Sequence, residues 1–109
     1  MAPRLPLKDN KGITHFEPPD EVLRLEARKQ YTAFIFNDGK EWLQSGCLKK
    51  WYERIKPTGL FCRVYKSHVV RVSEIEGKDS CGNIILKNGT LIPLSDEFKA
   101  ELSLLLPLL

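Results

Sequence analysis

The side chains best suited to chemistry form one short block, from Arg63 to His68. Arg63 and Lys66 can neutralise phosphate groups, and Tyr65, Ser67 and His68 can donate hydrogen bonds to phosphate oxygens. Apolar residues flank the block on both sides, so it reads as a polar connection between two strands. These residue types indicate contact with a polyanion such as nucleic acid.

A second block, Arg28-Lys29-Gln30, falls in a predicted turn. Glutamine can pair with an adenine edge in a major groove, and lysine with a guanine edge. The alternative for both blocks is a solvated loop, which composition alone favours slightly. Nucleic-acid binding therefore needs support from the rest of the chain.

The distribution of charge gives some of that support. The net charge is only +3, but residues 24–71 hold 11 basic and 4 acidic residues, a net +7, and the remaining residues carry a net −4. Segregation of this kind is typical of a protein that presents a basic face to a polyanion. On charge alone, chance clustering on a solvated surface is an equally good interpretation.

The sequence does not indicate an enzyme. It has no glycine-rich phosphate loop, no nucleophile or metalloprotease motif, and no suggestive pair of carboxylates. Cys62 and His68 are close in sequence, but nothing in the sequence supports them as a thiol and its base. We expect Cys62 to be a small buried residue and His68 to lie at the surface or to be hydrogen-bonded.

The three cysteines, Cys47, Cys62 and Cys81, are odd in number and widely spaced. This pattern disfavours both a disulfide framework and a structural zinc site, since a zinc site needs paired ligands. We therefore expect no metal and no cofactor. Reduced thiols fit a cytoplasmic location.

Length and hydropathy suggest a single domain, residues 1–109, with its core at about residues 5–102. The start of the chain lacks the apolar segment of a signal peptide. The longest apolar run, Leu104 to Leu109, is interrupted by Pro107 and is far shorter than the roughly 20 residues that span a bilayer. We expect neither a membrane nor a small-molecule substrate as a partner.

Residue patterns predict a mostly β chain. Alternating, β-branched or aromatic segments predict strands at 22–27, 31–36, 40–44, 61–65, 68–72, 84–87 and 90–92. Asp38-Gly39 and Asn88-Gly89 predict tight hairpins in which both central residues have positive φ. Residues 73–82 predict a loop or an irregular hairpin, and Pro93 suits an edge strand. Hairpin turns dominate, which disfavours a parallel βαβ arrangement.

Two helices are predicted. The internal one places Leu48, Trp51, Tyr52 and Ile55 on one apolar stripe, with Ser45 as its N-cap. Trp51 is expected in the core, and Pro57 and Gly59 end the helix. A C-terminal helix begins after Ser95, with Asp96 and Glu97 in its first turn and Phe98, Leu102 and Leu105 or Leu106 on its apolar face. No helix-turn-helix pattern is present.

Three stretches, in order and spacing, resemble the LytTR family of DNA-binding domains, which typically form the output half of bacterial response regulators. The strongest, Phe61 to Arg71, is similar to the family's Phe-x-Arg-(Val/Ile)-His-(Lys/Arg/Asn)-Ser pattern and the strand after it. The others are Glu21 to Ala27 and Gly89 to Ser95. Ile75 and the 43–55 helix also fall where the family has them. The resemblance spans about Leu5 to Leu102.

The resemblance implies an elongated fold of about ten strands in antiparallel sheets, with a short internal helix and a short C-terminal helix. It implies that loops enter successive major grooves of duplex DNA. By position, Gln30 and Lys66 are the implied base contacts. The flanking or backbone-contacting residues that it implies are Arg28, Lys29, Arg63, Ser67 and Lys99.

Three positions depart from the family pattern. Tyr65 replaces the usual histidine, which keeps a donor but changes its reach, and Arg71 replaces the usual asparagine. Asp96 stands where the family often has arginine. A carboxylate there repels phosphate, although it can accept a hydrogen bond from a cytosine amine. Tyr65 and Asp96 remain candidate DNA-binding residues, with affinity or specificity altered from the family norm.

The sequence thus predicts a sequence-specific DNA-binding regulator of bacterial transcription that binds promoter DNA, at paired repeat sites if the family pattern holds. The start at Met1 favours a free-standing unit over a fragment of a longer regulator. The alternative is an interaction module that keeps the fold with weak or lost DNA binding. Asp96 and the leucine-rich tail from Leu102 to Leu109 motivate this alternative, with a second copy or a regulatory protein as partner.

Overall fold

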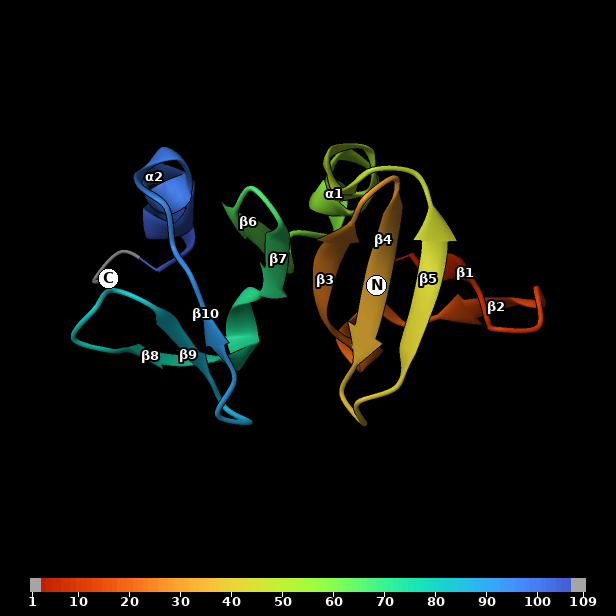
Figure 1. Cartoon of the computed structure of the whole chain (residues 1–109), viewed down its shortest axis with the longest axis horizontal. Helices are drawn as coiled ribbons and strands as arrows, with labels where there is room; N and C mark the ends of the chain where they lie inside the picture. Colours follow the sequence, from red (N-terminus) through yellow and green to blue (C-terminus); the bar gives the residue numbers. More distant parts are fainter. Residues whose placement is uncertain (1–2, 107–109) are drawn as a thin grey trace.

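The structure is a computed structural model that describes residues 3–106. Within that range the chain forms ten strands and two α-helices in an elongated molecule of 41 × 31 × 24 Å (Figure 1). In chain order the elements are β1 (Leu5–Lys8), β2 (Thr14–Glu17), β3 (Val22–Arg28), β4 (Tyr31–Phe36), β5 (Glu41–Ser45), α1 (Leu48–Ile55), β6 (Phe61–Tyr65), β7 (His68–Arg71), β8 (Ile75–Lys78), β9 (Ile84–Leu86), β10 (Leu91–Ile92) and α2 (Asp96–Leu105).

The strands form three antiparallel sheets. The central sheet has the order β5-β4-β3-β7-β6, with a β1-β2 hairpin at one end of the molecule and a β10-β9-β8 sheet at the other. Both helices lie on the same long side of the molecule (Figure 1). The expected mostly β, elongated and antiparallel architecture is confirmed.

Two hydrophobic cores share the middle of the central sheet. Neighbouring residues on β6 and β7 alternate between them: Phe61 and Val69 enter the core under α1, and Cys62 and Val70 enter the core under α2. This is the period-2 alternation of a strand buried on both faces. Cys62 is buried as predicted, and burial raises the pKa of its thiol to about 12.

The internal helix begins later than the sequence suggested. Ser45 is the last residue of β5, not an N-cap, and α1 starts at Leu48 with Cys47 in the capping position. Gly46, at φ +107°, makes the turn between strand and helix. The Trp51 indole donates to the Ser45 carbonyl at 2.9 Å, and the ring packs edge-on against Phe34 at 4.9 Å. The apolar stripe of α1 is buried, so Trp51 is a core residue as expected.

Both predicted hairpins form, but their turns differ from the prediction. In the turn after β4 the Phe36 amide donates to the Lys40 carbonyl at 2.9 Å, and only Gly39 has positive φ. The β9–β10 turn is similar, with Gly89 as its positive-φ residue. Each connection is therefore a three-residue loop closed by a left-handed glycine.

Residues 73–82 supply β8 and the turn of an irregular hairpin, so they are not simply a loop. β8 pairs with β9, and the register shifts between Ile75 and Gly77. The predicted C-terminal helix has Ser95 in its N-cap position, but the Ser95 hydroxyl is buried without a hydrogen-bond partner. The Ser95 amide instead donates to the Val64 carbonyl at 3.0 Å, so a backbone contact anchors the start of α2 to β6.

Candidate nucleic-acid interface

The two polar blocks meet at one end of the strands of the central sheet, where β3 turns into β4 and β6 turns into β7 (Figure 1). The Ala27 amide donates to the Ser67 carbonyl at 2.9 Å, which joins the β3–β4 turn to the β6–β7 turn. The Gly46 amide donates to the Gln30 carbonyl at 3.1 Å and brings the start of α1 to the same end. Since α2 is anchored beside β6, its first turn lies there too (Figure 1).

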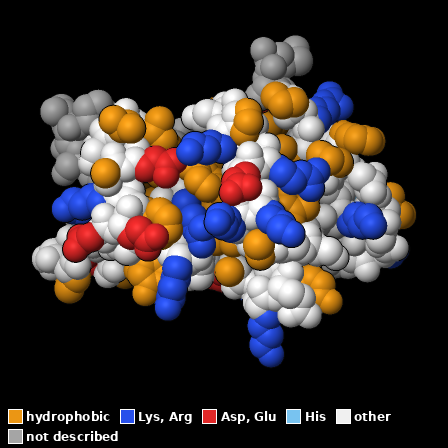
Figure 2. Space-filling model, turned by 90° about the horizontal axis from the view of Figure 1, so that it is seen from above, with side chains coloured by type: hydrophobic (Ala, Val, Ile, Leu, Met, Phe, Trp, Pro, Cys, Tyr) orange, Lys and Arg blue, Asp and Glu red, His pale blue; other side chains and the backbone are white. Residues whose placement is uncertain are grey.

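This side of the molecule forms a surface rich in positive charge, which we call the basic face. Its exposed basic residues include Lys29, Lys49, Lys50 and Lys66. Figure 2 views the molecule from this side and shows lysine and arginine side chains spread over the middle and over the half that carries α1. Acidic side chains gather mainly toward the half that carries α2. A basic surface of this kind attracts a polyanion, and the attraction weakens with added salt.

The β6–β7 turn holds its arginine by uncharged partners. The Arg63 Nη2 donates to the Lys66 carbonyl at 2.6 Å, and the guanidinium lies 5.1 Å from the centre of the Phe98 ring. These contacts fix the shape of the turn without compensating the charge of Arg63. Lys66 is exposed at the tip, and the Tyr65 ring is 6.1 Å from His68.

The β3–β4 turn has a strained backbone at its tip. Lys29 lies in the left-handed region at φ +58°, the only non-glycine residue among those described that does so. This conformation costs about 1–2 kcal/mol for a residue with a Cβ atom. Lys29 and Gln30 are both exposed, so they are available to an approaching partner.

Arg28, unlike Lys29 and Gln30, is already bound to side chains of its own chain. Its Nε donates to Glu26 at 2.7 Å and its Nη2 donates to Glu41 at 2.6 Å. The two carboxylates raise the pKa of Arg28. Arg24 adds a contact to Glu26 at 3.3 Å. Burial acts to raise the pKa of Glu26, but the hydrogen bonds from Arg28 and Arg24 outweigh it and hold that pKa below its usual value.

His68 lies between the two turns. Its side chain is 17% exposed, and its Nδ1 is buried without a hydrogen-bond partner, 3.9 Å from a Glu26 oxygen. Burial lowers the pKa of His68. His68 is thus half-buried rather than fully at the surface, and the expected hydrogen bond is not formed at its Nδ1.

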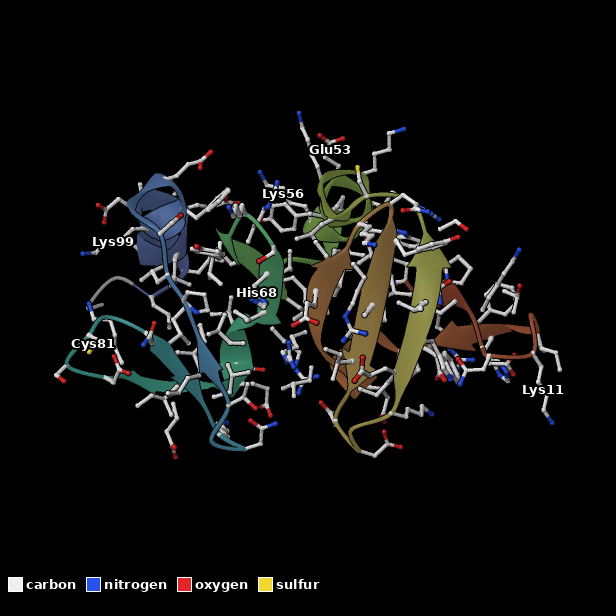
Figure 3. The ribbon with its side chains drawn as sticks, in the orientation of Figure 1. Lys11, Glu53, Lys56, His68, Cys81 and Lys99 are labelled. Carbon is white, nitrogen blue, oxygen red and sulfur yellow. The ribbon has the colours of Figure 1, made fainter. Side chains whose placement is uncertain are left out.

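Two predicted site residues, Asp96 and Lys99, lie near the start of α2 and differ in their position relative to the two turns. Asp96 is exposed in the first turn, where a carboxylate is favourable next to the free amides of the helix. Lys99 is also exposed, but Figure 3 shows it on the side of α2 that points away from β6 and β7. The structure therefore brings Lys29, Gln30 and Lys66 together and leaves Lys99 apart from them.

Lys49 and Lys50 are site candidates that the sequence prediction did not include. Both are exposed in the first turn of α1, which the Gly46–Gln30 hydrogen bond fixes beside the β3–β4 turn. They lie off the apolar stripe predicted for this helix, and no sequence pattern marked them as neighbours of Gln30. Cys47 is exposed at the same place, and hydrogen bonding to the Lys50 amide lowers the pKa of its thiol.

Arg71 has a structural role. It is buried, and its Nη1 donates to the carbonyls of Asp20 and Val22 and to the Asn37 side chain. Its Nη2 lies 3.4 Å from the Glu74 carboxylate. This arginine ties β7 to the segment before β3, which explains why it stands at this position.

The chain is similar to known DNA-binding domains over most of its length. The model of the LytTr DNA-binding domain matches residues 13–106. The chain belongs to the LytTR family of DNA-binding domains. No curated protein matches the chain. A solved structure described as the LytTr DNA-binding domain of a putative methyl-accepting/DNA response regulator from Bacillus cereus is similar, with a TM-score of 0.76 and 23% sequence identity. The match covers 97% of this chain and 98% of that chain, and at this identity it shows the fold.

Membership agrees with the chemistry of the basic face. LytTR domains bind DNA and are not a family of enzymes. Within residues 3–106 no cluster of side chains is suited to hold a metal ion, and no helix is long and apolar enough to cross a membrane. The basic face is therefore the candidate surface for DNA in this LytTR domain (Figure 2).

Proposed function

We propose that this LytTR domain binds duplex promoter DNA in a sequence-specific manner and regulates transcription in the bacterial cytoplasm. The observation that carries the proposal is the meeting of the two turns at the basic face, joined by the Ala27–Ser67 hydrogen bond. Turns held on a rigid sheet can enter a major groove as a unit, because the backbone of neither turn has to reorganise.

In this proposal Gln30 and Lys66 contact bases. Lys29, Arg63 and Ser67 bind the phosphate backbone, and Tyr65 contributes a hydroxyl near them. Lys49 and Lys50 extend the phosphate contacts along α1, and they are exposed next to Gln30. Arg28, Asp96 and Lys99 have weaker support, since Arg28 is paired with two carboxylates and Lys99 points away from the turns.

Selection from random duplexes tests the proposal directly. The domain is expected to enrich one motif, with binding that weakens steeply as salt rises. Lys66→Gln and Gln30→Ala should broaden the enriched motif, because base contacts carry the sequence information. Lys11→Gln is the matched control, since Lys11 is exposed in the β1–β2 turn at the far end of the molecule (Figure 3). Failure to enrich any motif contradicts specific binding.

A second candidate function is an interaction module. Leu104 is 82% exposed and Leu105 is 42% exposed on α2, although Leu102 is fully buried. Leu106 of the predicted docking tail is half-buried against a hydrophobic core, and Leu108 and Leu109 lie outside the described residues. An interaction module would bind its partner normally when the basic face is altered, so the Lys66→Gln variant separates the two functions.

A further inference from the structure

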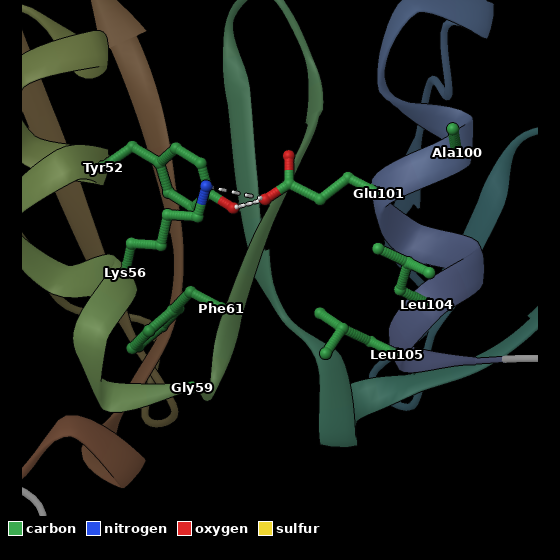
Figure 4. Close-up of a pocket in the computed structure, with 8 residues that line it drawn as sticks. All are labelled: Tyr52, Lys56, Gly59, Phe61, Ala100, Glu101, Leu104 and Leu105. Carbon is green, nitrogen blue, oxygen red and sulfur yellow. Dashed lines mark hydrogen bonds and ion pairs between the residues drawn. The ribbon is translucent and has the colours of Figure 1, made fainter.

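Two hollows border α1, and they differ in how their charges are used. The larger one has a volume of about 610 Å³ and lies between α1 and α2 (Figure 4). Its lysine, Lys56, lies 3.5 Å from Glu101, and the same carboxylate oxygen accepts a hydrogen bond from the Tyr52 hydroxyl at 2.5 Å. The charge of Lys56 is therefore compensated inside the molecule. The other walls of this groove are mainly apolar, with Phe61, Leu104 and Leu105 among them.

The smaller hollow has a volume of about 290 Å³ and lies where the β1–β2 hairpin, the end of β5 and α1 meet. Two of its lining residues, Lys8 on β1 and Arg54 on α1, are basic and exposed. Thr14 and Ser45 add hydroxyl groups to the lining. Within residues 3–106, no acidic side chain lines this hollow. We call it the Lys8–Arg54 pocket.

The two cations of the Lys8–Arg54 pocket are not compensated. No acidic side chain in the described part of the chain forms an ion pair with Lys8 or Arg54. The Arg54 guanidinium instead lies 4.2 Å from the centre of the Trp51 ring, a cation–π contact that orients it and leaves its charge uncancelled. Like charges beside one hollow repel each other, so an anion bound between them is favourable.

Hydrogen bonds fix the walls of the pocket before any ligand binds. The Gln44 side chain is only 5% exposed; it accepts from the Lys8 amide at 2.9 Å and donates to the Lys8 carbonyl at 2.8 Å. This pair of bonds ties β1 to β5. The Trp51 indole donates to the Ser45 carbonyl at 2.9 Å and ties α1 to the end of β5. The backbone around the pocket is thus preorganised, which lowers the entropic cost of binding.

We propose that the Lys8–Arg54 pocket binds the phosphate group of a small phosphorylated compound. The planar guanidinium of Arg54 can donate two parallel hydrogen bonds to a phosphate, and the Lys8 ammonium adds a second positive charge. The hydroxyls of Thr14 and Ser45 supply neutral donors. The volume lies just below the range of about 300–1,000 Å³ that is usual for small-molecule sites, so the pocket fits a phosphate with a small organic group.

A phosphate can come from a small compound or from the DNA backbone, and the charge of the pocket favours the first source. A phosphate monoester carries a charge of about −1.5 to −2 at pH 7, whereas each phosphodiester of DNA carries a single negative charge. Two uncompensated cations match the monoester, which is the form that small metabolites carry. The proposal does not rest on DNA binding, so it is tested without DNA first.

Nuclear magnetic resonance titration of the isotope-labelled full chain measures weak binding at single amides. Inorganic phosphate is the probe, added at constant ionic strength and at pH about 7.5, where it is mostly dianionic. Saturable shifts are expected at the amides of Lys8 and Ser45 and at the Trp51 indole. Arg54→Gln and Lys8→Gln should each weaken binding at least roughly tenfold, because each removes a charge-assisted hydrogen bond. Lys78→Gln is the matched control, since Lys78 is exposed on β8 in a separate sheet.

A second arm separates a free phosphate from the DNA backbone. Dimethyl phosphate is a diester with a single charge, so it should bind the pocket roughly tenfold more weakly than inorganic phosphate does. In fluorescence anisotropy titrations with duplex DNA, Arg54→Gln and Lys78→Gln should change the salt slope equally. A slope that Arg54→Gln alone lowers by about 0.9 assigns the pocket to the DNA backbone and overturns the proposal.

Two results of the phosphate titration also overturn the proposal. One is the absence of saturable shifts at the pocket while thermal melting shows a folded chain. The other is an equal loss of binding in Lys78→Gln and Arg54→Gln, which means that phosphate responds only to net charge. Failure of the proposed function looks different, since a chain that enriches no duplex motif yet binds phosphate at the pocket contradicts specific DNA binding alone.

Discussion

The β3–β4 turn and the β6–β7 turn lie side by side on the basic face, yet they hold their arginines in opposite ways. Arg28 is clamped by two carboxylates, Glu26 and Glu41, at 2.7 and 2.6 Å. Arg63 is held by a backbone carbonyl and by the face of Phe98. Both arginines have fixed positions, but only Arg63 keeps an uncompensated positive charge.

The difference shows that a count of basic residues overstates the field of a surface. The segment 24–71 holds 11 basic residues, but Arg28 and Arg24 share Glu26, and Arg71 is buried against carbonyl oxygens and Glu74. The positive charge that reaches a partner comes from exposed lysines and from Arg63 in its turn. We therefore expect the two turns to contribute unequally to binding.

The largest expected effect comes from Arg63. Arg63→Gln should weaken binding to every duplex alike and lower the salt slope of the binding constant by about 0.9, the value for one lost phosphate contact. Arg63→Lys is the control, since it keeps the charge but loses the planar contact with Phe98. Fluorescence anisotropy titrations at several salt concentrations measure the slope. A change in sequence preference with an unchanged slope would show that Arg63 reads bases instead.

Releasing Arg28 should have the next largest effect. Glu41→Gln removes one arm of the clamp, so Arg28 can reach a phosphate and the salt slope should steepen by up to about 0.9. Glu76→Gln is matched in charge, because Glu76 is exposed on β8, a strand of the separate β10-β9-β8 sheet. The same anisotropy titrations apply. If both variants strengthen binding equally, the clamp has no influence and only net charge matters.

Local patterns were enough to predict the two turns. Strand alternation and the glycine-containing hairpins gave most of the elements, and the apolar stripe of α1 gave the correct core face. Helix and strand boundaries were less accurate. The start of α1 depends on Gly46, whose positive φ lets the chain turn out of β5 before the helix begins, and the Ser45 N-cap signal was misleading for that reason.

The pairing of side chains between strands could not be predicted. Glu41 lies on β5 and Arg28 on β3, with β4 between them, so their contact depends on the register of three strands. The burial of Arg71 depends on carbonyls from the segment that precedes β3. Lys49 became a site candidate only when the Gly46–Gln30 hydrogen bond fixed α1 beside the β3–β4 turn.

The β3–β4 and β6–β7 turns also differ in the backbone conformation of their lysines, and this difference should have a smaller effect. Lys29 is left-handed and Lys66 is not. Lys29→Gly should therefore be about 1 kcal/mol more stable than Lys29→Ala, while Lys66→Gly should be less stable than Lys66→Ala. Urea unfolding measures the four free energies. At each position the glycine and the alanine variant should lose the same DNA affinity, because both substitutions remove the lysine charge. Equal stabilities of the two Lys29 variants would mean that the turn relaxes out of the left-handed region.

The smallest expected effect concerns His68, which lies between the two turns. Since burial lowers the pKa of His68 below its ordinary value of 6.5, the folded imidazole binds a proton more weakly than the unfolded one. As pH falls below 6.5, the unfolded chain takes up the proton first, so the free energy of unfolding should decrease until the folded imidazole is protonated too. Glu26 acts against this shift and Arg24 acts with it. His68→Gln should flatten the dependence in urea unfolding at pH about 7.5 and about 5.5, on either side of the ordinary histidine pKa. A stability that rises as pH falls through this window would mean that the His68–Glu26 pair forms and that the imidazole gains more from Glu26 than it loses by burial.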